Sequence, residues 1–139
     1  MIDGADVLLD TSILLYAALG REDEPARYET ARRIILEEDY AVCVWSLAAF
    51  YVQATHNAET PLQNGSAEDW IQTLARKPCQ PMDDKLLRDA MSLVQQHDLS
   101  LPNALLIAGA KRLGCRKIYS QNLEGAESVA DVEIVNPFN

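Results

Sequence analysis

Short apolar runs alternate with helical segments along this sequence, and that alternation constrains the fold more than any other feature. Residues 6–10 and 40–45 fit buried strands, and "KIYS" and "VEIV" fit the last two. "PCQPM" suits only a brief edge strand, because its prolines remove hydrogen-bond donors. Strands separated by helices predict an α/β fold, with a central parallel sheet of four to five strands and helices on both faces.

The helical segments have recognisable starts and stops. We expect helices over residues 11–20, 23–39, 47–57, 66–76, 84–97 and 100–114. Thr11 or Ser12 would cap the first, Ser46 the third and Ser66 the fourth, while Gly20 and Gly114 would end two of them. No linker or repeat divides the chain, so we expect one domain over residues 1–139.

Candidate site residues fall at the carboxyl ends of three of the expected strands. In a parallel sheet of this kind, ligands bind outside the carboxyl ends of the strands. Asp10, Trp45 and Ser120 fall at those ends. Asp10 lies where a strand passes into a helix, which is also an ordinary place for a helix cap.

The charge balance limits how the chain can bind partners. A formal net charge of −9 has the wrong sign for holding nucleic acid by charge alone, although a local basic patch or a bound metal can still do so. Arg112, Arg116 and Lys117 gather near a helix end, and we favour their suiting the helix dipole over an RNA patch. The absence of a long apolar run and of a signal-peptide pattern favours a cytoplasmic protein without membrane contact.

Five segments, in this order, carry a resemblance to a known family. They are "LLDTSILLYA", "AAFYVQATH", "DLSLPNALLIAGAKRLGC", "IYSQNLEG" and "VEIVNPF". Over nearly the whole chain they resemble the PIN-domain ribonucleases, above all the VapC toxins of bacterial toxin–antitoxin pairs. The resemblance implies a PIN-like domain and metal-assisted hydrolysis of RNA, with three or four carboxylates holding Mg²⁺ or Mn²⁺. It also implies RNA, an antitoxin-like protein and a second copy of the chain as partners.

Most of the family's carboxylates are replaced in this sequence. Asp10 matches the first, but the family's Glu position falls on Ala49 and its Asp-Ala position on Asn103. The acidic pair of the last motif falls on Gln121 and Asn122. We therefore expect a vestigial site and an inactive or very weak nuclease that acts by binding RNA or protein. Asp10 alone would hold Mg²⁺ or Mn²⁺ weakly or not at all.

The alternative is an active metal-dependent endoribonuclease that uses Asp10 and recruited acids. The candidates for recruitment are Asp83, Asp84, Asp98 and Glu124, of which Glu124 is the best placed because it follows a strand end. The candidate binding residues beside the site are Thr11, Ser120 and Glu124. The replacements suit natural drift better than deliberate inactivation, since one swap suffices to disable an enzyme.

Overall fold

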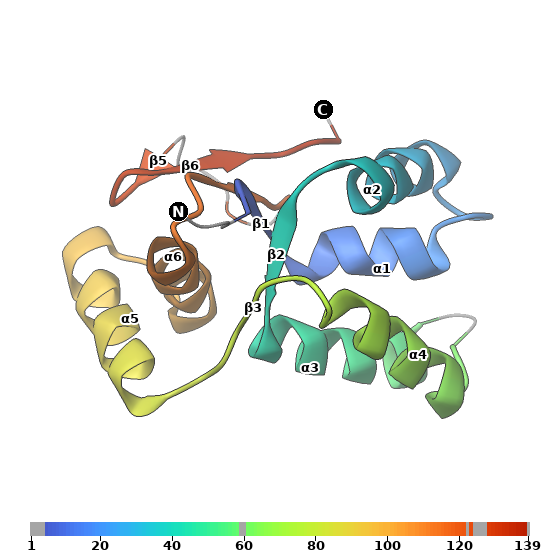
Figure 1. Ribbon diagram of the computed structural model, residues 1–139, viewed down its shortest axis with the longest axis horizontal. Coiled ribbons are helices and arrows are strands. Elements are labelled where there is room, and N and C mark those ends of the chain that lie inside the picture. Colours follow the sequence, from blue (N-terminus) through green and yellow to red (C-terminus); the bar gives the residue numbers. More distant parts are fainter. Residues whose placement is uncertain (1–4, 59–60, 122, 124–127, 139) are drawn as a thin grey trace.

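The computed structural model describes residues 5–58, 61–121, 123 and 128–138, and within them a central sheet lies between two sets of helices (Figure 1). The strands are β1 (Val7–Leu9), β2 (Tyr40–Cys43), β3 (Cys79–Gln80), β4 (Lys117–Tyr119), β5 (Ser128–Val129) and β6 (Val132–Val135). Their order in the sheet is β3-β2-β1-β4-β6-β5. All pairs are parallel except β5 with β6, so the predicted α/β fold is confirmed with one antiparallel edge strand added.

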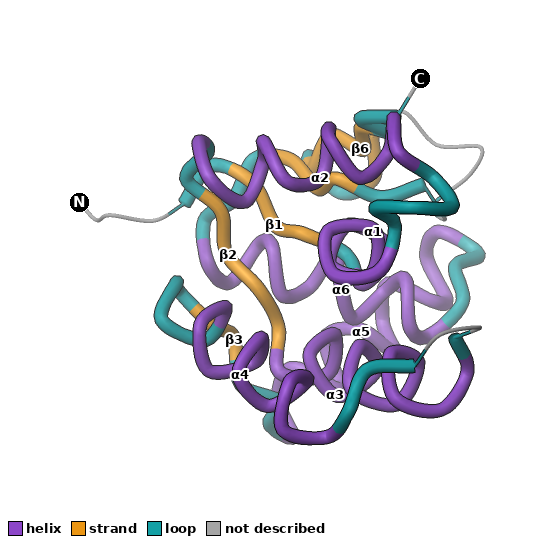
Figure 2. Tube along the Cα trace, turned by 90° about the vertical axis from the view of Figure 1, so that its right-hand side faces the viewer, coloured by secondary structure: helices purple, strands orange, loops and turns teal. Residues whose placement is uncertain are grey.

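Helices cover both faces of the sheet. They are α1 (Thr11–Leu19), α2 (Pro25–Glu37), α3 (Val44–Val52), a π-helical turn η1 (Gln53–Asn57), α4 (Asn64–Leu74), α5 (Asp84–His97) and α6 (Leu101–Leu113). Alternate side chains of β1 separate the two faces: Val7 and Leu9 pack with α1 to α4, whereas Leu8 packs against α6. Seen from the side, α1 lies next to α2, and α3 next to α4 (Figure 2).

Three predicted helix caps are wrong. Asp10, rather than Thr11 or Ser12, caps α1. Helix α3 begins at Val44, so Ser46 lies in its first turn, and α4 begins at Asn64 without a side-chain cap. The strand predicted over residues 40–45 ends at Cys43, because packing of Trp45 against α6 overrides the strand propensity of Val44 and Trp45.

Glycine permits that close contact. A Cβ atom on Gly109 of α6 would lie 3.1 Å from the indole ring of Trp45 and 3.1 Å from the Cys43 sulfur. Residues Ala104–Ala110 of α6 are all buried, and Gly114 ends the helix in the left-handed conformation at φ 77°, as predicted. Helix α6 is therefore packed into the hydrophobic core on one face of the sheet. No helix among the described residues is long and apolar enough to cross a membrane.

Candidate functional site

A cleft of about 420 Å³ opens at the carboxyl ends of β1 and β2, where α1, α3 and α6 begin. It is lined by Asp10, Thr11, Trp45, Ser46, Ala49, Gln53, Leu101, Pro102, Asn103, Leu105 and Leu106. Three of the positions singled out in the sequence, Asp10, Ala49 and Asn103, thus meet at one place from three separate segments. Asn122 and Glu124 lie outside the described residues.

Asp10 is buried, and both of its carboxylate oxygens accept hydrogen bonds. Oδ1 accepts from the backbone N–H of Thr11 at 2.7 Å, and Oδ2 accepts from the Ser120 hydroxyl at 2.6 Å. The backbone N–H of Asp10 also donates to the Tyr119 carbonyl at 3.1 Å. The carboxylate therefore joins the start of α1 to the end of β4 and supports the fold as a cap.

The other walls of the cleft bring little charge. Ala49, on α3, presents a methyl group, and Asn103, in the first turn of α6, presents a neutral amide. The Asn103 backbone N–H donates to the Ser100 hydroxyl that caps α6. Leucine and proline side chains of α6 complete an apolar wall. An amide oxygen can ligate a cation, but it supplies no negative charge.

Gln121 lies away from the cleft wall, in a separate cluster. Its Nε2 donates to the Tyr16 hydroxyl at 3.0 Å, and its Oε1 accepts from Arg27 Nη1 at 3.4 Å. The Arg27 guanidinium also lies over the Phe138 ring, 5.9 Å from its centroid. These hydrogen bonds connect Gln121, which follows β4, with Tyr16 of α1 and Arg27 of α2. Arg27 in turn contacts Phe138.

The acids considered for recruitment have other contacts. Asp83 caps α5 by accepting from the Leu86 N–H at 2.7 Å, and it also accepts from Arg112 at 2.7 Å. Asp84 pairs with Arg88 at 3.1 Å, and Asp98 ends α5 at φ 54°. Within the part of the chain that the structure describes, Asp10 is the one carboxylate lining the cleft, and no three His, Cys, Asp or Glu side chains gather as a metal cluster.

Sequence reasoning missed Ser46 and Gln53 as cleft residues. They lie three residues before and four residues after Ala49, so helical periodicity places them on the same face and could have found them. Gln53 begins the π-helical turn η1, and such turns often occur at functional sites. Thr11, a predicted binding residue, lines the cleft and donates to the Ser46 carbonyl at 3.4 Å.

Three helices, α1, α3 and α6, begin at the cleft, and a helix start carries a partial positive charge. The Asp10 carboxylate caps α1, and the Ser100 hydroxyl caps α6. Helix α3 has no side-chain cap, so backbone N–H groups at its start can donate to an acceptor group of a ligand.

The chain was compared with known proteins at the levels of family, sequence and structure. The family model of the PIN domain matches residues 7–130. No curated protein matches the sequence significantly.

Several solved structures are similar over nearly their whole length. A toxin–antitoxin complex from Klebsiella pneumoniae has a TM-score of 0.70 at 17% identity, covering 94% of this chain and 97% of that one. VapC20 of Mycobacterium tuberculosis, a toxin that cleaves the sarcin–ricin loop, gives 0.69 at 16% identity and covers 91% and 98%. FitAcB from Neisseria gonorrhoeae gives 0.65 at 18% identity and covers 95% and 98%. At such identities the likeness shows the fold.

Proposed function

The chain belongs to the PIN domain family, and from that membership we propose that it binds RNA without metal-dependent cleavage. The observation that carries the proposal is the state of Asp10. Among the described residues it is the cleft's single carboxylate, and both of its oxygens are engaged in hydrogen bonds.

A metal ion fits these residues poorly. PIN nucleases generally use Mg²⁺ or Mn²⁺, which need several oxygen ligands and the negative charge of carboxylates. Ala49 supplies neither, and Asn103 supplies no charge. To ligate a metal, Asp10 would have to share oxygens that now hold Thr11 and Ser120. A weakly held ion would also lower the pKa of an attacking water less effectively.

The remaining chemistry of the cleft suits binding. The start of α3 offers backbone N–H groups, and Thr11, Gln53 and Asn103 offer neutral polar groups beside an apolar wall. Phosphate oxygens and the edges of bases are acceptors that such donors recognise. RNA would thus enter the position that it occupies in a nuclease and remain uncut. Action in the cytoplasm is part of the proposal.

A protein partner is the second part of the proposal. One of the similar solved structures is itself a toxin–antitoxin complex. On α3, Val44 and Val52 are 44% and 50% exposed and, eight residues apart, lie on one face of the helix. Exposed apolar groups aligned in this way favour a contact with an antitoxin-like protein or with a second copy of the chain. A Val44→Lys, Val52→Lys variant should lower the mass measured by light scattering if the chain dimerises there.

Calorimetric titration of Mn²⁺ into the purified protein tests the central claim. We expect no measurable heat of binding at millimolar metal and no cleavage of labelled RNA. Micromolar binding, or cleavage that requires the metal, would favour the alternative of an active endoribonuclease with recruited acids. Glu124→Gln then identifies the source: loss of that activity would show Glu124 to be the recruited acid.

A further inference from the structure

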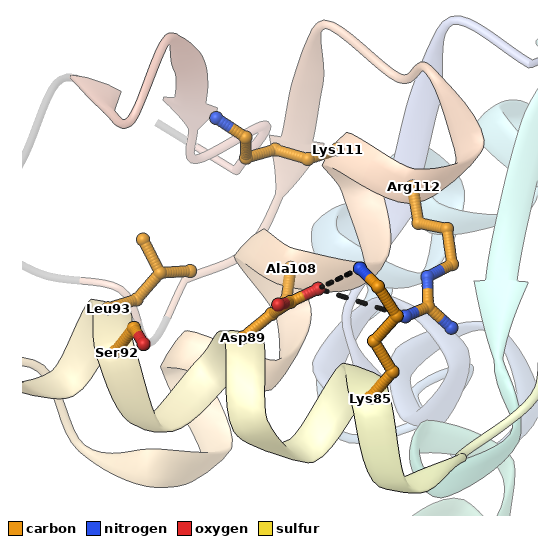
Figure 3. A pocket seen from close by; sticks show the side chains of 7 residues that line it. All are labelled: Lys85, Asp89, Ser92, Leu93, Ala108, Lys111 and Arg112. Carbon is orange, nitrogen blue, oxygen red and sulfur yellow. Dashed lines mark hydrogen bonds and ion pairs between the residues drawn. The ribbon is translucent and has the colours of Figure 1, made fainter.

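A second hollow, of about 360 Å³, lies between α5 and α6, and we call it the α5–α6 groove (Figure 3). Its lining comprises Lys85, Asp89, Ser92 and Leu93 from α5, with Ala108, Lys111 and Arg112 from α6. In Figure 3, Lys85 and Arg112 approach Asp89 from one side, while Lys111 extends along the opposite wall above Leu93. The groove is separate from the cleft and has a different chemical lining.

Positive charge exceeds negative charge in this groove. The Asp89 Oδ2 atom lies 3.4 Å from Lys85 Nζ and 3.8 Å from Arg112 Nη2, so one carboxylate is shared by two cations. Arg112, with its side chain only 27% exposed, also pairs with Asp83 at 2.7 Å. Lys111 donates to the carbonyl of Ala130 at 3.1 Å and, within the described residues, has no carboxylate partner. Three cations against two acids, Asp89 in the lining and Asp83 beside Arg112, leave an excess of one positive charge, which suits an anion.

The groove lies in the least acidic part of an acidic chain. Residues 83–114, which contain α5 and α6, have four Lys and Arg side chains against four Asp and Glu, whereas the rest of the chain has eight against seventeen. A polyanion is therefore repelled less by the α5–α6 region than by the rest of the molecule. This uneven distribution favours the α5–α6 region for the approach of RNA.

Helix α6 connects the groove with the cleft. Asn103 in its first turn lines the cleft, and Lys111 near its last turn lines the groove. At 1.5 Å per residue, the two positions lie about 12 Å apart along the helix axis, a span that a few nucleotides cover. Leu93 and Ala108 add an apolar surface on which a sugar or base can rest.

We propose that Lys85, Lys111 and Arg112 bind a backbone phosphate of the same RNA strand that occupies the cleft. The proposal rests on the RNA binding proposed above. Lys85 and Lys111 are exposed, and the four-carbon stem of lysine lets each turn toward a phosphate oxygen, while the Arg112 side chain is held by its 2.7 Å ion pair with Asp83. Asp89 competes with the phosphate for the same cations.

Fluorescence anisotropy of a labelled single-stranded oligouridylate, with the full chain at low salt, tests the proposal. Lys85→Gln with Lys111→Gln should weaken binding about tenfold and reduce the slope of log affinity against log salt by about 0.7, the contribution of one phosphate on a single strand. The matched control, Arg32→Gln with Arg33→Gln, makes the same charge change on exposed positions of α2. It should alter affinity by less than about twofold. Equal losses in both variants, or no loss in the first, would overturn the proposal.

Removal of the Asp89 carboxylate, which competes with the phosphate, should change RNA affinity in the opposite direction. Asp89→Asn should strengthen RNA binding several-fold by freeing Lys85 and Arg112, whereas Asp69→Asn, an equal charge change on α4, should have little effect. No gain with Asp89→Asn would contradict the proposal, and so would an equal gain with Asp69→Asn.

Further outcomes distinguish the groove proposal from binding of free phosphate and from failure of the proposed function. If inorganic phosphate raises the melting temperature through Lys85 and Lys111 while the oligouridylate does not bind, the groove serves free phosphate and the RNA assignment is wrong. Metal-dependent cleavage by the wild-type chain would overturn the proposed function but leave the loss of affinity in the groove variant intact. Uncut RNA bound equally by the groove variant would reject the groove alone.

Discussion

The cleft and the α5–α6 groove share α6 but use charge in opposite ways. In the cleft, the single described carboxylate, Asp10, is buried and hydrogen-bonded on both oxygens. In the groove, Lys85 and Asp89 are largely exposed and held by loose ion pairs. Buried hydrogen-bonded charge stabilises a fold, while exposed charge contributes little to stability and remains available to a ligand. The comparison separates residues kept for structure from residues free to bind.

The largest effect expected from this comparison is at Asp10. Asp10→Ala removes the cap of α1 and the acceptor of the Ser120 hydroxyl, which should cost about 2–4 kcal/mol of unfolding free energy. Thermal melting should show a decrease of about 10 °C. Asp69→Ala, an exposed site on α4, is the control and should stay within about 0.5 kcal/mol. A loss at Asp10 no greater than the control's would contradict the structural role assigned to these two hydrogen bonds.

A smaller effect should follow from returning acids to the cleft. Ala49→Glu with Asn103→Asp places two carboxylates beside Asp10, and their mutual repulsion should destabilise the metal-free protein by about 1–3 kcal/mol at neutral pH. Repulsion raises their folded-state pKa values, so the deficit should shrink as the pH falls through these raised values and be absent below the ordinary carboxyl pKa of about 4. Mn²⁺ should recover the melting temperature by binding the folded state.

The control for this variant adds equal charge elsewhere. Ala48→Glu with Asn64→Asp lies at exposed positions of α3 and α4 and should respond to neither the pH change nor Mn²⁺. If the cleft variant behaved like this control, the three positions would not form one vestigial site.

The smallest effect concerns Asp83, at the edge of the groove. The Leu86 N–H and, secondarily, Arg112 hold the pKa of Asp83 below its ordinary value. Because the folded pKa is lowered, its stabilisation is present above the unfolded pKa of about 3.9 and is lost as the pH falls through the folded value.

Two substitutions separate the cap from the charge at this position. Asp83→Ala should lower the melting temperature by a few degrees at neutral pH and by less in acid, and Asp83→Asn should keep most of the cap. Asp84→Ala, which loses an exposed pair with Arg88 and a first-turn acid of α5 but no side-chain cap, is the matched control. A deficit for Asp83→Ala that did not change with pH would show that charge at the groove edge is irrelevant.

The sequence predicted the architecture and the place of the cleft because both follow from local pattern. Apolar runs and capping residues defined α5 with the bounds Asp84–His97 that the structure shows. β5 was missed because it has two residues, and its turn uses Ala130 and Asp131 at positive φ rather than glycine or asparagine.

The groove could not be predicted in the same way. From the sequence, Arg112 was interpreted as a charge that suits the end of its own helix, and this interpretation used only residues near it in the chain. The packing of α5 against α6 brings Lys85 and Asp89 to it, and the resemblance gave no motif for that surface. The double hydrogen bonding of Asp10 likewise depends on Ser120, 110 residues away, which no helical or strand period connects.

The two hydrogen bonds of Asp10 have an evolutionary consequence. A lineage that abandoned catalysis would still be selected to fold, and loss of this aspartate would expose it to unfolding and degradation. The side chains of Ala49 and Asn103 line the same cleft without a comparable hydrogen bond to another element among the described residues. On the proposed function, the presence of the first aspartate alone would therefore be a poor indicator of enzymatic activity, and the residues at the other acidic positions would be the better ones.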